Sequence, residues 1–324
     1  MNRILKAFSL IALIAFFASC KKDDDVSIAP PRDFGVQNKA DMDSIYKFLK
    51  THTVDLNETT YEATFPDLTE GQTSIWKDSR LDSIKVRRNS TDYIVYYLNF
   101  RQGVGDAPSG VDDITVNYRG TLLNGTQFDY RPVSGEGFSL NSVVAKGWQD
   151  ILPLFNSGTY LGGDDGNPAS FADFGAGAMF LPSGLSYFNA SPSNLVPAYS
   201  CMVFTFQLFD VTYTDIDGDK ILNKDEFEIN DETGARIAVV FSDTDGDGIP
   251  NYADTDDDGD GFLTKDEIRK LVDGLTSTTE YYTYDEMFNE DGSLKEEFKC
   301  ANTIRKNYFV PKYMDNACRG GIAQ

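Results

Sequence analysis

The stretch of sequence that decides the fold is Val116–Asp129, VNYRGTLLNGTQFD, in a chain of 324 residues. Where it begins, Ile114, Val116 and Tyr118 alternate with threonine and asparagine. Because successive side chains of a strand point to opposite faces, these three share one face. The dipeptide Asn124-Gly125 is typical of a tight hairpin turn. The stretch therefore predicts two antiparallel strands joined at residues 124–125.

More secondary structure is predicted on both sides of this hairpin. Tyr93–Phe100 (YIVYYLNF) is rich in aromatic and β-branched residues and predicts a strand. Cys201–Val211 predicts another strand, with Cys201 on the face opposite to Met202, Phe204, Phe206 and Leu208. Asp41–His52 has apolar residues at helical spacing and predicts an amphipathic helix that packs on the domain behind it.

The order of these motifs resembles FKBP-type peptidyl-prolyl isomerases over about residues 90–212. The motifs are Val116–Leu122, Asn124–Asp129, Phe138–Leu140, Val143–Trp148, Leu181-Pro182 with Ser186-Tyr187, and Leu195–Pro197 with Met202–Phe204. Thr159–Gly175 reads as an insertion within this pattern. The resemblance implies an α+β fold, with an antiparallel half-barrel sheet wrapped over a short helix near Trp148.

The resemblance also implies an aromatic pocket for an X–Pro bond. Its residues would be Tyr118, Phe128, Asp129, Val144, Trp148, Tyr187 and Phe204. In the family's arrangement Trp148 would form the floor beneath the proline ring, the Tyr187 hydroxyl would donate to a substrate carbonyl, and Asp129 would accept from Tyr118. Leu195 and Val196 would form part of a flap. No catalytic cofactor is expected, because the reaction breaks no covalent bond.

The composition excludes several classes of function. Acidic residues outnumber basic ones by 51 to 29, which gives a net charge of −22. This excess argues against nucleic acid, whose phosphates it would repel. His52 is the only histidine, so multi-histidine zinc sites are excluded. The excess of acid is instead consistent with cation binding or with a strongly solvated surface.

The N-terminus predicts a lipid anchor. The apolar run Ala7–Ala18 is too short to span a bilayer and is typical of a signal peptide. It leads to Cys20 in a pattern similar to a bacterial lipoprotein signal; a cleaved secretory signal is the alternative. Lys21–Asp25 resembles the export tag of surface lipoproteins and equally fits a plain spacer. An outer-membrane lipoprotein facing the periplasm or the cell surface is predicted, with a mature net charge of −24 after Arg3 and Lys6 are removed.

Three acidic loops follow the isomerase-like region. Ca²⁺ prefers six to eight oxygen ligands, which the EF-hand loop supplies at fixed spacing. The predicted ligands are Asp215, Asp217, Asp219, Asn223 and Glu226; Asp243, Asp245, Asp247, Asn251 and Asp254; and Asp256, Asp258, Asp260, Phe262 (by its carbonyl), Thr264 and Glu267. Lys220 replaces the turn glycine of the first loop. Asp243–Gly261 resembles thrombospondin type-3 repeats, and Ile268–Leu275 is predicted to be a helix leaving the last loop.

The chain is thus divided into six segments. They are a signal peptide (1–19), a tether (20–37), an N-terminal helical segment (38–80), an FKBP-type isomerase domain (81–212), a calcium module (213–275) and a C-terminal tail (276–324). Cys300 and Cys318 could form a disulfide bond, which would leave Cys201 unpaired. Two functions stay open: a prolyl isomerase acting on polypeptides outside the cytoplasm, or a calcium-dependent surface protein that only grips peptide with a catalytically weak isomerase-like domain.

Overall fold

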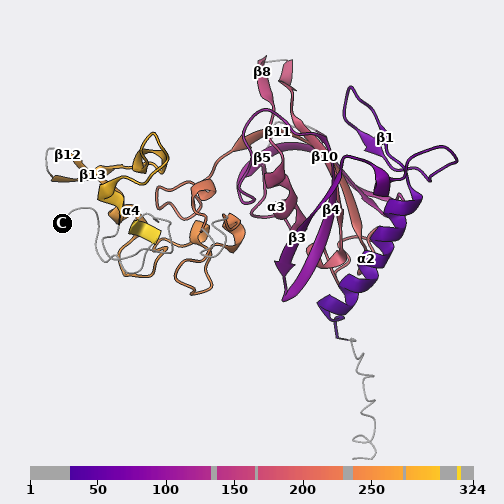
Figure 1. Ribbon diagram of the computed structural model, residues 1–324, viewed down its shortest axis with the longest axis horizontal. Coiled ribbons are helices and arrows are strands. Elements are labelled where there is room, and N and C mark those ends of the chain that lie inside the picture. The colour runs from indigo at the N-terminus through magenta and orange to yellow at the C-terminus, as the bar shows by residue number, and fades with distance from the viewer. Residues whose placement is uncertain are drawn as a thin grey trace, which may run out of the picture. The chain divides into compact units, whose positions relative to one another are not determined.

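The computed structural model describes residues 30–132, 137–164, 167–228, 236–272, 275–299 and 312–314 (Figure 1). Almost all of the described residues belong to one compact unit, which begins at Asp33. The predicted signal peptide, Cys20, Cys300 and Cys318 lie outside the described residues. Within the described part of the chain, no helix has the length and apolar character needed to cross a membrane.

A seven-stranded antiparallel sheet forms the centre of this compact unit (Figure 1). The order is β3-β4-β10-β11-β5-β6, and β7 pairs with β5 beside β6. The strands are β3 (Leu81–Arg88), β4 (Thr91–Arg101), β5 (Asp113–Leu122), β6 (Gln127–Arg131), β7 (Phe138–Ser139), β10 (Gly175–Leu181) and β11 (Met202–Thr212). The predicted hairpin is confirmed: Thr121 pairs with Gln127 across the turn, and Gly125 has φ +83°. An antiparallel sheet with few helices agrees with the predicted fold class.

One face of the sheet packs on the short helix α3 (Gly147–Ile151) and the 3₁₀ turn η2 (Leu152–Leu154). Trp148, Leu152 and Phe155 are buried there against Phe204 and Phe206 of β11. The short helix was predicted at this place. Between it and β10, the insertion forms the hairpin of β8 (Thr159–Asp164) and β9 (Asn167–Ala172).

The opposite face of the sheet packs on helix α2 (Phe34–Thr51). Its residues Ile45 and Leu49 are fully buried against a second core that contains Phe180 and Cys201. The helix begins at Phe34, so the predicted start at Asp41 was wrong. Phe34–Gln37, which were assigned to the tether, belong to the helix. The reason is the cap: the Asp33 side chain accepts a 2.9 Å hydrogen bond from the Val36 N–H.

Three short elements link α2 to the sheet. They are β1 (Asp55–Leu56), which pairs with β2 (Ala63–Thr64), and the 3₁₀ turn η1 (Ile75–Lys77). Strand β10 lies between the two cores, and every residue of it is buried. A strand covered on both faces reads as a continuous apolar run, which is the pattern of Gly175–Leu181.

The acidic part of the chain contains mainly short turns. These are η4 (Asn223–Asp225), η5 (Val239–Phe241), η6 (Asn251–Ala253), α4 (Thr264–Glu267), η7 (Asp285–Met287), η8 (Glu296–Phe298) and η9 (Lys312–Met314), and β12 (Arg269–Val272) pairs with β13 (Leu275–Tyr281). A small core of Ile221, Ile268, Met287, Leu294, Phe298, Tyr313 and Met314 holds them together. The predicted helix over 268–275 was wrong. A short apolar run does not distinguish helix from strand, and pairing with the β-rich segment Leu275–Tyr281 decides for a strand.

Candidate functional site

An aromatic cavity of about 210 Å³ opens on the α3 side of the sheet. It is lined by Tyr118, Asp129, Phe138, Ser142, Val143, Val144, Ala145, Trp148, Tyr187 and Phe204. All the predicted pocket residues are in this lining except Phe128. Phe128 packs edge-on against Phe204, with ring centroids 5.6 Å apart, and so supports the wall from behind.

Trp148 occupies the position of a floor. Only 2% of its surface is exposed. The centroid of its ring lies 5.1 Å from that of Tyr118 and 5.2 Å from that of Phe204, and both contacts are edge-on. The centroid of the Phe138 ring lies 5.5 Å away. Edge-to-face contacts of this kind fix ring orientation beyond what burial alone supplies. The cavity is therefore preformed by rings held in place on several sides.

Two glycines allow these rings to come so close. A Cβ at Gly120 of β5 would lie 2.7 Å from the Phe128 ring and 2.9 Å from the Phe204 ring. A Cβ at Gly147, the first residue of α3, would lie 2.3 Å from Leu181. Both distances are shorter than carbon atoms tolerate. The glycines in the motifs around Gly120 and Gly147 thus set the depth of the site.

The polar edge of the cavity is built by Tyr118 and Asp129. The Tyr118 hydroxyl donates a 2.8 Å hydrogen bond to Asp129 Oδ2, as the resemblance implied. The other carboxylate oxygen accepts from the Tyr130 N–H at 2.8 Å. Burial, and then the hydrogen bond to the Asp129 carboxylate, raise the pKa of Tyr118 well above its usual value. Tyr118 therefore stays protonated and orients the charge of Asp129 beside the cavity.

The Tyr187 hydroxyl is a hydrogen-bond donor available to a bound polypeptide. Burial, and secondarily the charge of Asp129, raise the pKa of its hydroxyl, so it stays protonated at neutral pH. This hydroxyl makes no hydrogen bond to any residue that the structure describes. On the predicted flap, Val196 is buried, whereas Leu195 and the rim residue Val144 are exposed. A polypeptide reaching the cavity would meet apolar side chains at the rim and one hydroxyl donor inside.

Four lining residues were not among those predicted: Phe138, Ser142, Val143 and Ala145. Three of them lie in the motifs Phe138–Leu140 and Val143–Trp148, of which only Val144 and Trp148 were predicted as pocket residues. Ser142 had no signal of its own. It enters the lining because Asn141-Ser142 forms a turn, in which the Ser142 N–H donates to the Ser139 carbonyl at 3.3 Å.

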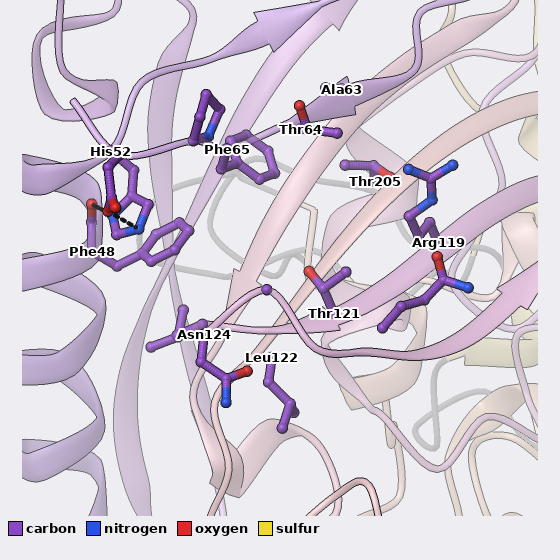
Figure 2. A pocket seen from close by; sticks show the side chains of 15 residues that line it. Phe48, His52, Ala63, Thr64, Phe65, Arg119, Thr121, Leu122, Asn124 and Thr205 are labelled. Carbon is purple, nitrogen blue, oxygen red and sulfur yellow. Dashed lines mark hydrogen bonds and ion pairs between the residues drawn. The ribbon is translucent and has the colours of Figure 1, made fainter. Parts of the chain in front are cut away.

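A larger cavity of about 560 Å³ lies on the other face of the sheet (Figure 2). Arg119, Thr121 and Thr205 line it, and these residues alternate along β5 and β11 with the residues of the aromatic cavity. Phe48 of α2 and Phe65 close it from the helix side. The two cavities are thus separated by the thickness of the sheet.

The three acidic loops repeat one pattern of hydrogen bonds. The first aspartate of each loop accepts from the backbone N–H five residues on, at Lys220 (3.3 Å), Gly248 (3.1 Å) and Gly261 (3.1 Å). The third and fifth positions repeat a second contact, in which each aspartate accepts from the N–H two residues on. Such loops fold the odd-numbered carboxylates inward, as the calcium-loop template requires.

Carboxylate oxygens meet in three groups, each with its ligand atoms within 4.8 Å of one another. The groups are Asp217, Asp219, Glu226 and Asp257; Asp243, Asp245 and Asp247; and Asp256, Asp258 and Asp260. Asp215, Asp254 and Glu267 are not in these groups, although Glu267 is buried beside its own loop. Asp257 was not predicted, because the second position of the template carries no ligand.

The side chains at the ninth position of each loop form hydrogen bonds close to the start of the same loop. Asn223 accepts from the Ile216 N–H at 3.1 Å and donates to Thr214 Oγ1 at 2.7 Å. Asn251 accepts from the Thr244 N–H at 2.9 Å and donates to Thr244 Oγ1 at 2.9 Å. Thr264 accepts from the Asp257 N–H at 3.2 Å. Their predicted role as ligands, like that of the exposed Phe262, stays a prediction.

Burial gives the first group unusual acidities. Desolvation, reinforced by the neighbouring carboxylates, raises the pKa of Asp217 to about 7, of Asp219 to about 8 and of Glu226 to about 11. The pKa of Asp257 is raised well above its usual value for the same reasons. Carboxylates this crowded repel one another unless a cation or protons neutralise them.

Comparison with known proteins finds relatives over the part of the chain that holds the aromatic site. FKBP-type peptidyl-prolyl cis-trans isomerase FkpA of Aeromonas hydrophila is 28% identical over 202 residues, 61% of this chain and 69% of that protein. Peptidyl-prolyl cis-trans isomerase Mip of Coxiella burnetii is 39% identical over 130 residues, 40% of this chain and 47% of that protein. The N-terminal and middle part of this chain is homologous to FKBP-type peptidyl-prolyl cis-trans isomerases. The predicted enzyme class is confirmed by these relatives.

Two further comparisons concern a solved structure and a family model. The crystal structure of FkpA from Escherichia coli aligns with 64% of this chain and 70% of that chain, at 21% identity and a TM-score of 0.33. The family described as BamM C-terminal matches residues 210–296. This second match begins at the end of β11 and covers all three acidic loops.

Proposed function

We propose that residues 81–212 accelerate cis–trans rotation about X–Pro bonds in polypeptides outside the cytoplasm. The observation that carries the proposal is the preformed cavity, floored by Trp148 and edged by the Tyr118–Asp129 pair. The homology to FKBP-type isomerases over this region supports the same conclusion.

The geometry suits this reaction because its barrier, about 18–20 kcal/mol, is lost amide resonance. The twisted amide is less charge-separated than the planar one, so an apolar cavity opposes the twist less than water does. Trp148 and Phe204 supply the apolar walls, and the Tyr187 hydroxyl can hold a neighbouring carbonyl of the bound chain. These contacts stabilise the twisted form over the planar ones, which is differential binding of the transition state.

The test is a protease-coupled isomerisation assay on residues 21–324. Wild-type protein should accelerate the reaction, and Asp129→Val and Tyr187→Phe should depress the acceleration. Far-UV circular dichroism of each variant controls for folding. A folded wild-type protein that gives no acceleration would refute the proposal.

A second candidate function is peptide binding without efficient turnover. The observation in its favour is the cavity of about 560 Å³ on the opposite face, which exceeds the aromatic cavity and is within the usual size range of ligand sites. Slow turnover combined with tight binding of unfolded polypeptide, lost on Phe65→Asp but kept in Tyr187→Phe, would favour it.

We further propose that the acidic module binds Ca²⁺ through its three loops. The shared hydrogen-bond pattern and the converging carboxylates of Asp217, Asp245 and Asp258, each with its group, support this assignment. The donors are all oxygens, which suit a hard cation such as Ca²⁺. The ion would be structural. Calorimetric titration of the calcium-free chain should show binding, and EDTA should increase protease sensitivity within residues 213–299.

We also propose that Cys20 carries a lipid anchor and that the mature chain resides at the outer membrane. The apolar run and the residues around Cys20 support this. Mass spectrometry of protein isolated from membranes should detect acyl groups on Cys20. Cys20→Ser should release the chain into the soluble extracytoplasmic fraction, and an unchanged membrane fraction would exclude the anchor.

A further inference from the structure

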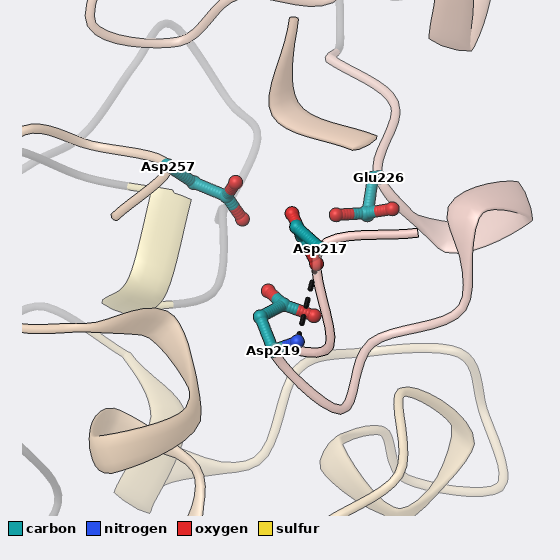
Figure 3. Close-up of side chains that lie close together, drawn as sticks. All are labelled: Asp217, Asp219, Glu226 and Asp257. Atoms are coloured by element: carbon teal, nitrogen blue, oxygen red, sulfur yellow. Dashed lines mark hydrogen bonds between the residues drawn. The ribbon is translucent and has the colours of Figure 1, made fainter. Parts of the chain in front are cut away.

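Four carboxylates from two separate loops converge in the acidic module (Figure 3). Asp217, Asp219 and Glu226 belong to the first loop, and Asp257 comes from the third. Figure 3 shows the Asp257 side chain directed toward the other three. The loop template accounts for the first three and leaves Asp257 without a role.

The burial of Asp257 distinguishes this cluster from a group of acidic residues at the surface. Only 1% of its surface is exposed, and both of its carboxylate oxygens lack a hydrogen-bond partner among the described residues. Glu226 is fully buried with both oxygens in the same condition, and Asp217 and Asp219 each have one such oxygen. A buried carboxylate without a partner is strongly unfavourable. Four of them at one point need a cation, or bound protons, to neutralise them.

Among the described residues, no ion pair is made to any of these four carboxylates, and Lys220 acts on Asp219 only through its more distant charge. Lys220 is the cation closest in sequence, but it is half exposed and lies 4.0 Å from Asp215, which is outside the group. The unpartnered atoms are carboxylate oxygens alone, with no nitrogen or sulfur ligand. Six such oxygens satisfy the number that Ca²⁺ takes, whereas Mg²⁺ usually retains several waters.

We propose that one Ca²⁺ ion is held jointly by Asp217, Asp219, Glu226 and Asp257, and so ties the first loop to the third. This inference rests on the proposed calcium function and adds to it a ligand supplied between loops. Its consequence follows from the position of Asp257. Its neighbours Asp256 and Asp258 belong to the third carboxylate group, so one short segment serves two ions.

Sharing this segment couples the two sites. An ion at the first site fixes Asp257, and with it the backbone that presents Asp256 and Asp258. Filling one site should therefore increase affinity at the other, and the coupling is reciprocal. The second group, Asp243, Asp245 and Asp247, shares no residue with the first and serves as a matched control within the same chain.

The test compares Asp257→Asn with Asp247→Asn, at an exposed member of the second group, in residues 21–324. The measurements are calorimetric titration of Ca²⁺ and thermal unfolding in EDTA and in Ca²⁺. Asp257→Asn should weaken the ion of the first site by roughly tenfold or more and reduce affinity at the third. It should also reduce the rise in melting temperature that saturating Ca²⁺ produces over EDTA, because one ligand of the ion is lost. Asp247→Asn should affect only its own site.

Two results would overturn parts of the argument separately. Wild-type protein that binds no Ca²⁺ would refute the calcium module itself. Wild-type protein that binds Ca²⁺, with Asp257→Asn leaving every affinity unchanged while Asp217→Asn weakens one, would show that the first loop acts alone. Asp217→Asn also keeps the test valid if Asp257→Asn does not fold, because the bridging ion predicts that Asp217→Asn lowers third-loop affinity too.

Discussion

One buried carboxylate, that of Asp41, joins helix α2 to the turn before Tyr187, in addition to the apolar contacts of the helix, and its removal is the most informative perturbation. Asp41 is only 2% exposed. It accepts hydrogen bonds from the Ser183 N–H (2.8 Å), the Ser183 hydroxyl (2.6 Å) and the Gln37 amide (2.6 Å). Ser183 begins the 3₁₀ turn η3 (Ser183–Leu185), and its carbonyl accepts from the N–H groups of Ser186 and Phe188, on either side of Tyr187.

Asp41→Ala would leave these donors buried without an acceptor. An unpaired buried donor costs about 1–3 kcal/mol. The Ser183 N–H cannot turn away, whereas its hydroxyl and the Gln37 amide can partly rearrange, so we expect a net loss of about 3 kcal/mol in the free energy of unfolding. In a domain of this size that loss lowers the melting temperature by about 6–12 °C.

The loss should also reach the aromatic cavity, because Tyr187, two residues after η3, lines it. We expect kcat/KM for prolyl isomerisation to fall about tenfold, measured well below the melting temperature of the variant, where misplacement rather than unfolding is responsible. Asp43→Ala is the matched control, since Asp43 lies on the exposed side of the same helix. It should change stability by no more than about 0.5 kcal/mol. Unchanged stability and activity in Asp41→Ala would refute this reasoning.

Three further outcomes follow from individual residues. Tyr118→Phe should lower kcat/KM about tenfold, because Asp129 loses a charge-assisted hydrogen bond beside the cavity; isomerisation kinetics at constant ionic strength would measure this, and wild-type turnover would contradict it. Lys220→Gly should stabilise the calcium-loaded chain by about 1 kcal/mol, since Lys220 adopts φ +85° where glycine is unstrained; denaturant titration with Ca²⁺ present would show the sign. Cys201 should resist thiol reagents at pH 8 until the protein unfolds, because burial raises its pKa far above the usual value; rapid native labelling would contradict this.

The sheet and the aromatic cavity could be predicted from sequence because local signals agree there with long-range pairing. The alternation in β11 predicted that Cys201 lies opposite to Met202 and Phe204, and the two cores divide in that way. The turn at Asn124-Gly125 fixed the register of β5 and β6. Motif order then placed the cavity residues, because each motif belongs to a strand or helix whose position the pairing determines.

Two predicted elements were wrong because a hydrogen-bonding contact, rather than the spacing of apolar residues, determines the structure there. The start of α2 depends on the Asp33 cap rather than on the apolar stripe. The segment 269–272 has an apolar run too short to distinguish helix from strand, and its pairing with β13 decides. In both cases the deciding atoms are backbone N–H and carbonyl groups, which a pattern of side chains does not report.

Asp257 was missed as a candidate ligand for a different reason. A loop template assigns ligands by spacing within one loop, so a residue that serves a neighbouring loop has no place in it. Asp257 follows Asp256 directly, and the chain bends and turns at these two residues. The Asp256 carboxylate lies with Asp258 and Asp260 of its own loop, whereas the Asp257 carboxylate lies with Glu226 and its unpartnered oxygens. A run of consecutive acidic residues inside a calcium loop therefore indicates two sites back to back, provided that the second residue is buried.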